Sequence, residues 1–317
     1  MSAPTDSAHL KTAFQQKGAF QQKGEFQQKV EFLHTDLACE ANRPCASSEE
    51  RTVTVGHLPV TVTRRRETDG GSFVTVACGR ITEHGEGDLP VLARLLADEL
   101  THMAADLLGC PVEPTCRVLV AGLGNADMTP DAVGPGTVRR LTVTRHLKAY
   151  DAALFNALGC CELAALSPGV MGQTGVEAGE LVRAAAELTK PDLLIVIDAL
   201  AARSCERLAS TIQLSDRGIA PGSGVGNHRM AIDRSTMGCP VIGLGVPTVV
   251  DSSTLVWDAL TQAGMTGAEG TLPPELEAVL ETGRSFIVSP RDSDRMVELT
   301  CMLLARALDL AFGVKDI

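Results

Sequence analysis

Short runs of apolar residues recur along the middle of the chain, at residues 117–121, 193–197 and 241–244. Each run is followed by a loop rich in Gly, Pro or Asp and then by apolar residues at helical spacing. Strands that are apolar at every position are typical of parallel sheets covered by helices on both faces. A last strand at 285–288 precedes a predicted helix over 292–312. The pattern therefore predicts an α/β fold with a mostly parallel, doubly wound sheet.

Residues 51–83 follow a different pattern, in which apolar and polar residues alternate. The segments 53–55, 60–63 and 73–76 are rich in Val and Thr, and a glycine-containing turn lies at 69–71. Alternation of β-branched residues around such a turn is typical of antiparallel strands. We predict a small β meander here that covers an edge or a face of the main sheet.

Two further helices are predicted from apolar residues that recur every three or four positions. The first spans residues 89–108 and ends at Gly109. The second reaches Leu188, and Thr174 and Glu177 have the spacing of a capping box at its start.

The first 33 residues differ in kind from the rest, because near copies of the unit AFQQKG begin at residues 13, 19 and 25. A period of six fits neither a helix nor a strand, and Gln and Lys offer little apolar surface to bury. Two interpretations stay open, a disordered tail and a removable pro-segment.

Charge and cysteine content narrow the function classes. The 317-residue chain has 39 Asp and Glu against 28 Lys and Arg, a net charge of −11, which repels a phosphate backbone. We therefore expect no direct nucleic-acid partner.

The ten cysteines form no CxxC pair and no zinc-ligand spacing, so we expect reduced thiols and no metal or other cofactor. No secretory h-region and no run of eighteen apolar residues is present, which favours a cytoplasmic protein without a membrane span.

Candidate chemistry should lie in the loops at the carboxyl ends of the parallel strands. The loop GLGNADMTPDAVGP (122–135) begins like a dinucleotide fingerprint, but Asp127 occupies the third glycine position and would repel a pyrophosphate. Its Asp131, and Asp198 directly after the strand 193–197, are the two carboxyls that such loops present. Gly222 and Gly224 lie in a third, glycine-rich loop that either admits another backbone or is merely flexible.

Two carboxyls held close together cannot both ionise readily, so one can act as an acid and the other as a base that activates water. Structural roles are open for each residue alone. Asp131 could stabilise the first turn of the following helix, and Asp198 could cap a helix or pair with Arg203.

Several loops resemble those of the spore germination endopeptidase family, the proteases of small acid-soluble spore proteins. The loops that carry the resemblance are GLGNADMTPDAVGP (122–135), SPGVMGQTGVEAGE (167–180), PDLLIVIDALAARS (191–204), TIQLSDRGIAPGSGVGN (211–227) and GVPTVVD (245–251). The resemblance implies an atypical aspartic endopeptidase of the spore core, made as an inactive precursor and homotetrameric. It also implies a fold similar to that of hydrogenase-maturation peptidases.

The resemblance assigns roles to particular residues. Asp131 and Asp198 match the family's two proposed catalytic aspartates. The segment around Asp36 and Leu37 resembles the substrate pattern of an acidic residue, an aliphatic residue or Phe, Ala, and Glu two positions further on. It implies self-cleavage after Asp36, which divides the chain into a pro-segment, 1–36, and a protease domain, 37–317. An acidic residue before the cut calls for a cation, for which Arg203 and Arg229 are the candidates.

Two alternatives belong to other mechanisms. A metal-dependent peptidase could use the same scaffold, with Asp131 and Asp198 as ligands, although no matching His is evident. A nucleotide-binding regulatory domain could instead use the glycine-rich loops that begin at Gly122 and Gly222.

Overall fold

The computed structural model describes residues 35–41, 43–221, 229–265, 275–276, 279 and 286–314. The six-residue repeats, and with them most of the predicted pro-segment, lie outside these residues. So do Gly222 and Gly224.

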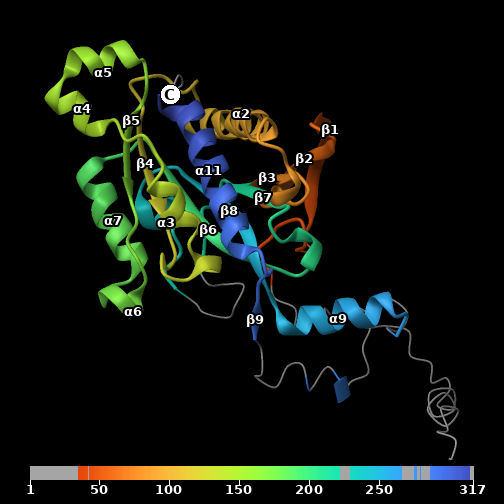
Figure 1. The fold of residues 1–317 in the computed structure, drawn as a ribbon. Helices are drawn as coiled ribbons and strands as arrows, with labels where there is room; N and C mark the ends of the chain where they lie inside the picture. Colours follow the sequence, from red (N-terminus) through yellow and green to blue (C-terminus); the bar gives the residue numbers. More distant parts are fainter. Residues whose placement is uncertain are drawn as a thin grey trace, which may run out of the picture. The chain divides into compact units, whose positions relative to one another are not determined.

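One mixed sheet of nine strands runs through the described part of the chain, in the order β1-β2-β3-β7-β8-β6-β4-β5, with β9 beside β8 (Figure 1). The four parallel strands are β4 (Arg117–Gly122), β5 (Glu162–Leu166), β6 (Leu193–Ala202) and β8 (Val241–Asp251). The predicted α/β fold with a mostly parallel core is confirmed. The strand predicted to end at Ile197 continues to Ala202, because its pairing with β8 persists past Asp198.

The antiparallel strands extend this sheet instead of covering it. They are β1 (Cys45–Val55), β2 (Leu58–Glu67), β3 (Ser72–Ala77), β7 (Thr211–Ser215) and β9 (Ile287–Val288). The predicted meander forms, and β3 pairs with β7, which joins it to the parallel half. The meander is thus an edge of the main sheet, since its backbone hydrogen bonds continue into β7 and β8.

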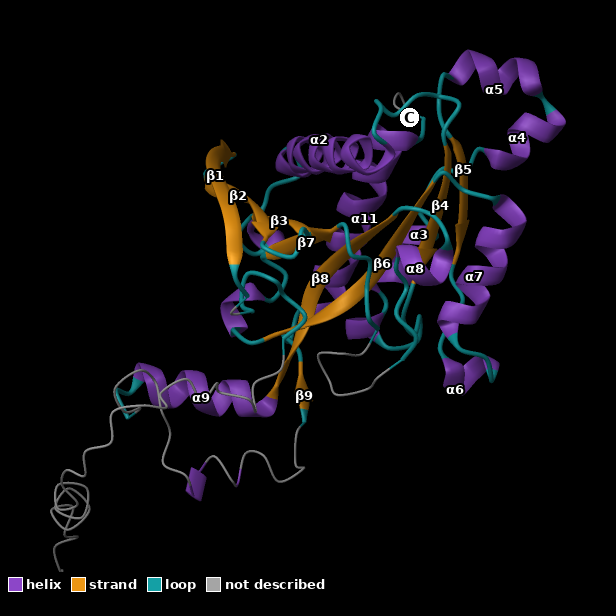
Figure 2. Ribbon diagram, turned by 180° about the vertical axis from the view of Figure 1, so that it is seen from behind, coloured by secondary structure: helices purple, strands orange, loops and turns teal. Residues whose placement is uncertain are grey.

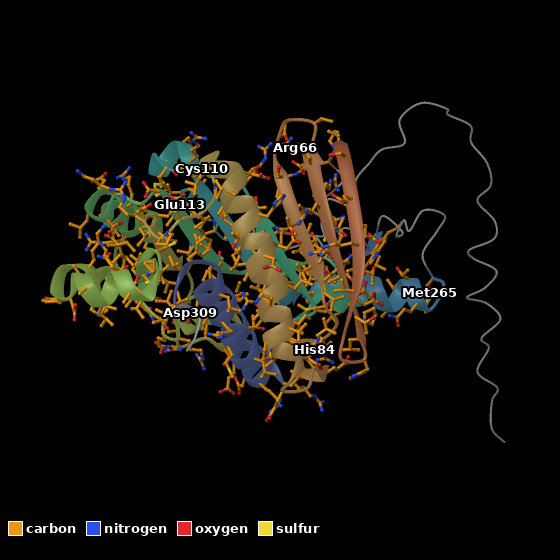
Figure 3. All side chains as sticks on the ribbon, turned by 90° about the horizontal axis from the view of Figure 1, so that it is seen from above. Arg66, His84, Cys110, Glu113, Met265 and Asp309 are labelled. Atoms are coloured by element: carbon orange, nitrogen blue, oxygen red, sulfur yellow. The ribbon has the colours of Figure 1, made fainter. Side chains whose placement is uncertain are left out.

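Helices cover both faces of the sheet. Their bounds are α2 (Asp88–Leu108), α3 (Val133–Val138), α4 (Arg145–Tyr150), α5 (Ala152–Leu158), α6 (Met171–Thr174), α7 (Ala178–Thr189), α8 (Arg234–Met237), α9 (Ser252–Gln262) and α11 (Ser293–Phe312), with short 3₁₀ turns η1 (Ile81–Glu83), η2 (Thr129–Asp131) and η3 (Cys205–Arg207). Seen from above, α2 lies beside α11, which carries the labelled Asp309 (Figure 3). Within the described residues, no helix is long and apolar enough to span a membrane.

Strand periodicity assigns side chains to the two faces. Val118 and Val120 of β4 pack with α2 and α11 in the larger apolar core. Leu119 and Ala121 belong to the second core, to which α7 and α8 contribute. Figure 2 shows these two helices together on the other face of the sheet. Because side chains alternate along a strand, Asp198 of β6 shares the face of Leu194 and Val196, which is the face of this second core.

The helix α7 begins later than the capping pattern predicts. Thr174 belongs to α6, and its hydroxyl accepts from the backbone N–H of Val176 at 3.2 Å. Glu177 is the N-cap residue of α7, without a side-chain cap. The predicted capping box is therefore wrong, because Gly175, with φ of 73°, ends α6 and separates the two helices.

Strand order places a crevice at one position of the sheet. From β4 the chain passes outward to β5 and then crosses back to β6 on the other side of β4. The connection from β4 leads to β5 on one side, and that from β6 leads to β7 and β8 on the other. The loops leaving these two neighbouring strands therefore turn in opposite directions, which opens a crevice at the carboxyl ends of β4 and β6. Both predicted aspartates belong to this place, since Asp131 follows β4 and Asp198 lies on β6.

Glycines let the loop after β4 pack backbone against backbone. A Cβ on Gly122 would lie 2.3 Å from the carbonyl oxygen of Gly134, and one on Gly134 would lie 2.3 Å from that of Leu123. Gly124 has φ of +112°, and its Cβ would overlap the carbonyl oxygen of Asp131. These contacts fold the loop onto the start of α3 and set the position of Asp131. They account for the glycines of the fingerprint-like sequence without a nucleotide.

Substituting Gly122 should destabilise the protein. The added methyl of Gly122→Ala has no space beside Gly134, so we expect a loss of about 1–3 kcal/mol in the free energy of unfolding, measured by denaturant titration. Gly172→Ala is the matched control, because no atom lies within 4 Å of its Cβ position. Equal stability of the two variants would show that the loop tolerates a side chain at position 122.

Candidate active site

Asp131 is held at the mouth of the crevice by the loop after β4. Its Oδ2 accepts from the backbone N–H of Asn125 at 2.7 Å. The hydroxyl of Thr248, on β8, donates to the carbonyl oxygen of Pro130 at 2.7 Å and ties the loop to the sheet. Burial raises the pKa of Asp131, while the Asn125 N–H and the charge of Arg229 act in the opposite direction. The carboxyl thus serves its own loop and not the first turn of α3.

Asp198 lies inside the sheet. It belongs to β6, opposite Gly245 of β8, and is 7% exposed. Burial raises the pKa of Asp198 to about 8, and the negative charges of Asp131 and Asp36 add to the shift. The backbone N–H of Ala199 donates to its Oδ1 at 3.0 Å. A carboxyl in this environment stays protonated at neutral pH.

The two aspartates line the same cavity, whose volume is about 360 Å³. Asp36 and Arg229 line it as well, together with apolar groups of β6, β8 and the loop after β5. The N–H of Asn125 and the charge of Arg229 favour the ionised form of Asp131, whereas burial favours the protonated form of Asp198, so the pair favours one proton and one charge. The cavity therefore contains one carboxyl that can donate a proton and one that can accept a proton.

The two candidate cations have different positions. Arg229 lines the cavity, and its positive charge opposes the rise in the pKa of both aspartates. Arg203 lies beyond the carboxyl end of β6, and its backbone N–H donates to Glu40 Oε2 at 2.7 Å. Its guanidinium Nε is buried without a hydrogen-bond partner. The structure therefore brings Arg229 to the aspartates, whereas Arg203 binds the N-terminal segment through its main chain.

The N-terminal segment 35–41 packs along the last residues of β6. The backbone N–H of Asp36 donates to the carbonyl oxygen of Ala201 at 3.0 Å, and the Ala201 N–H donates to Asp36 Oδ2 at 2.9 Å. Leu37 is 1% exposed, in a third apolar cluster with Leu200 and Val250. The sequence pattern marked this segment for cleavage but gave no sign that it is bound beside the aspartates.

Three carboxyl groups, of Asp36, Asp131 and Asp198, line the cavity. Across the described residues, no group of three or more His, Cys, Asp and Glu side chains has an arrangement that could hold a metal ion. The cavity also contains the guanidinium of Arg229, which offers no lone pair to a metal ion and repels a second cation. These residues do not fit a metal centre.

Comparison with known proteins identifies the family. The family model described as germination protease matches residues 38–263. The germination protease of Clostridium acetobutylicum is 35% identical over 259 residues, which are 76% of this chain and 78% of that relative. That of Caldanaerobacter subterraneus subsp. tengcongensis is 33% identical over 310 residues, covering 88% and 94%. That of Clostridium perfringens strain 13 is 45% identical over 194 residues, covering 60% and 56%. The chain belongs to the germination protease family and is a peptidase, as the loop motifs indicated.

Among solved structures, the chain is similar to the NiFe hydrogenase maturation protease HycI from Thermococcus kodakarensis. The TM-score is 0.31 at 17% sequence identity, over 64% of this chain and 98% of that one.

The raised pKa of Asp198 predicts how stability depends on pH. A carboxyl with a higher pKa in the folded than in the unfolded chain stabilises the fold fully below about pH 4, and this contribution is lost as the pH rises through about 8. Asp198→Asn is neutral at every pH. We therefore expect its Tm to gain on that of the wild type between pH 5 and pH 9, measured by thermal unfolding. A difference in Tm between Asp198→Asn and the wild type that stays constant over this range would contradict the prediction.

Proposed function

We propose that the chain is an aspartic-type endopeptidase that degrades small acid-soluble spore proteins during germination. The observation that carries the proposal is the buried, protonated Asp198 in one cavity with Asp131. Family membership supplies the peptidase class, and the two carboxyls supply the acid and the base that hydrolysis of a peptide bond requires.

The pair holds one proton, which is sufficient for hydrolysis of a peptide bond. Asp131, as the carboxylate, takes a proton from a water molecule whose oxygen bonds to the carbonyl carbon of the substrate. The carbonyl oxygen receives the proton of Asp198. When the tetrahedral intermediate collapses, Asp198 regains a proton, the C–N bond breaks, and Asp131 passes its proton to the leaving nitrogen. The pair returns to its starting state with one proton, and it titrates as a unit.

We further propose that the precursor processes itself between Asp36 and Leu37. Asp36 lines the cavity of the two aspartates, and Leu37 and Glu40 anchor the segment on the far side of the bond. A chain segment bound in this way both presents a peptide bond to the pair and excludes other substrates. Cleavage would then release residues 1–36 and free the cavity.

Assembly and location follow from the family resemblance. We propose a homotetramer in the cytoplasm of the spore core. The net charge of −11 supports a substrate that is cut when free of DNA, because an acidic enzyme is repelled by the duplex that such proteins coat.

Removing either carboxyl should abolish hydrolysis. We expect Asp131→Asn and Asp198→Asn each to lower kcat/KM by about 10²–10⁴-fold on a peptide with the sequence of residues 33–43, measured by mass spectrometry of the products. Asp127→Asn makes the same substitution in the same loop outside the cavity and should keep wild-type activity. Loss in only one of the two variants would rule out the shared acid and base. Activity that a chelator removes and a divalent ion restores would favour a metal-dependent peptidase.

Self-processing has its own test. Incubation of the full chain should yield a product that begins at Leu37, whereas Asp198→Asn should keep its original N-terminus, because the acid is absent. Intact-mass measurement over time follows both chains. An active enzyme that retains residues 1–36 would contradict self-processing. It would not contradict the proposed peptidase activity, which the peptide assay tests separately.

A further inference from the structure

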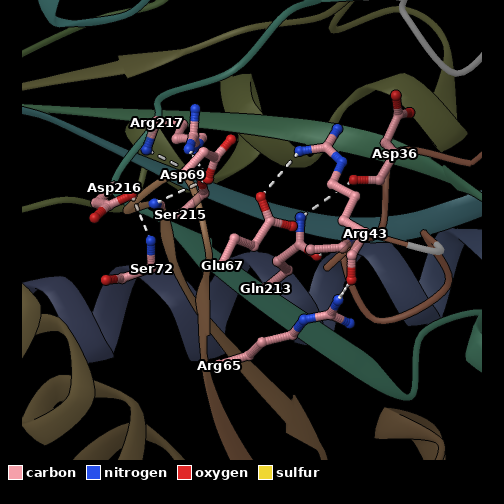
Figure 4. Close-up of polar contacts among 12 residues, drawn as sticks. Asp36, Arg43, Arg65, Glu67, Asp69, Ser72, Gln213, Ser215, Asp216 and Arg217 are labelled. Carbon is pink, nitrogen blue, oxygen red and sulfur yellow. Dashed lines mark hydrogen bonds and ion pairs between the residues drawn. The ribbon is translucent and has the colours of Figure 1, made fainter. Parts of the chain in front are cut away.

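The side chain of Gln213 lies against the N-terminal segment beside Asp36 (Figure 4). Its Nε2 donates to the carbonyl oxygen of Asp36 at 3.2 Å. Its Oε1 accepts from the backbone N–H of Ala38 at 2.6 Å. One amide thus holds the main chain on both sides of the bond for which cleavage is proposed.

Gln213 is an unusual residue for its place in the sheet. It lies in β7, an inner strand, between the buried Ile212 and Leu214, and is itself 7% exposed. A buried amide without partners would destabilise the fold, so such a group needs hydrogen bonds from its surroundings. The two side-chain bonds that the structure shows for it both go to the main chain of the N-terminal segment. The amide is matched to a bound peptide.

Gln213 and Asp198 lie at the same level of the sheet, on either side of β8. Gly245 of β8 pairs with Asp198 on one side and with Gln213 on the other. Residues that pair across neighbouring strands point to the same face, so both side chains project from one face, two strand spacings or about 10 Å apart at the backbone. Asp36 lines the cavity of Asp198 and also the neighbouring cavity that Gln213 lines. The peptide segment lies between the two side chains.

Further contacts fix which bond Gln213 meets. Leu37 fills the apolar cluster at the end of β6. The carboxylate of Glu40 accepts from the backbone N–H groups of Arg203 at 2.7 Å and Ser204 at 3.1 Å. Sliding the segment by one residue would break these anchors together, so the carbonyl of Asp36 is the one presented to the Gln213 amide.

We propose that Gln213 is a catalytic residue that binds the carbonyl oxygen of the scissile peptide, in the chain's own segment and in protein substrates of the same pattern. This inference rests on the proposed function. As water adds to the carbonyl carbon, the electron pair of the C=O bond moves to the oxygen, and the Nε2–H group stabilises the growing charge until the proton of Asp198 arrives. The Oε1 atom, on the N–H two residues further on, keeps the peptide extended and in register.

The test compares self-cleavage rates of full-length chains by intact mass. Gln213→Met keeps the length of the side chain and removes both hydrogen bonds, so its first-order rate should fall by about 10²–10³-fold. Gln213→Glu has no donor while ionised and regains an O–H donor when protonated. Its rate, divided by that of the wild type, should therefore rise as the pH is lowered. Gln262→Glu, at the exposed end of α9, is the control for added charge and should match the wild type at every pH.

The outcomes separate the inference from the function on which it rests. Wild-type self-cleavage by Asp198→Asn would overturn the proposed function itself. If Asp198→Asn is inactive while Gln213→Met cleaves at the wild-type rate, the peptidase stands and the role of Gln213 is refuted. A flat rate ratio for Gln213→Glu, combined with a lowered Tm, would assign Gln213 to packing alone and would also overturn the inference.

Discussion

Burial of a carboxyl inside the sheet is the constraint on which the site depends. Asp198 lies on an inner strand, and an ionised carboxylate there would be far less stable than a protonated one. The fold avoids that charge by retaining a proton, and the neighbouring carboxylates strengthen its retention. The loop after β4 then brings Asp131 to the same cavity, held by a backbone N–H that favours its ionised form. The two carboxyls thus differ in their environment because one lies in the sheet and the other in a loop.

The strand β6 connects the chemistry with peptide binding. Its pairing with β8 shifts register between Leu200 and Ala201, beyond Asp198. The residues after the shift bind the N-terminal segment. Ala201 pairs with Asp36, and the backbone N–H groups of Arg203 and Ser204 donate to the carboxylate of Glu40. Because Asp198 and the residues that bind the segment belong to β6 or directly follow it, the bound segment has a fixed position relative to Asp198.

Local periodicity was sufficient for the long elements and for the two aspartates. The strand β4 and the helices α2 and α11 were predicted within a few residues, whereas β6 and β8 extend five and seven residues beyond their predicted ends at 197 and 244. Loops at the carboxyl ends of parallel strands are few, so Asp131 and Asp198 could be singled out. Elements of five residues, such as β5 and β7, carry too few positions for a period to be visible. An acidic residue after apolar ones also resembles the end of a strand, which is why β6 was predicted too short.

The parts of the site that escaped prediction depend on contacts between distant residues. Gln213 meets Ala38 across 175 positions, and Glu40 meets Arg203 across 163. No local pattern distinguishes a glutamine that binds a peptide from one on a solvated strand face. Only the partner strands show that this one is buried, and only the docked segment supplies the groups that satisfy it. A buried glutamine on an inner strand whose two side-chain hydrogen bonds both go to the main chain of a docked segment is therefore a sign of peptide binding, since the same donor and acceptor fit the main chain of another peptide.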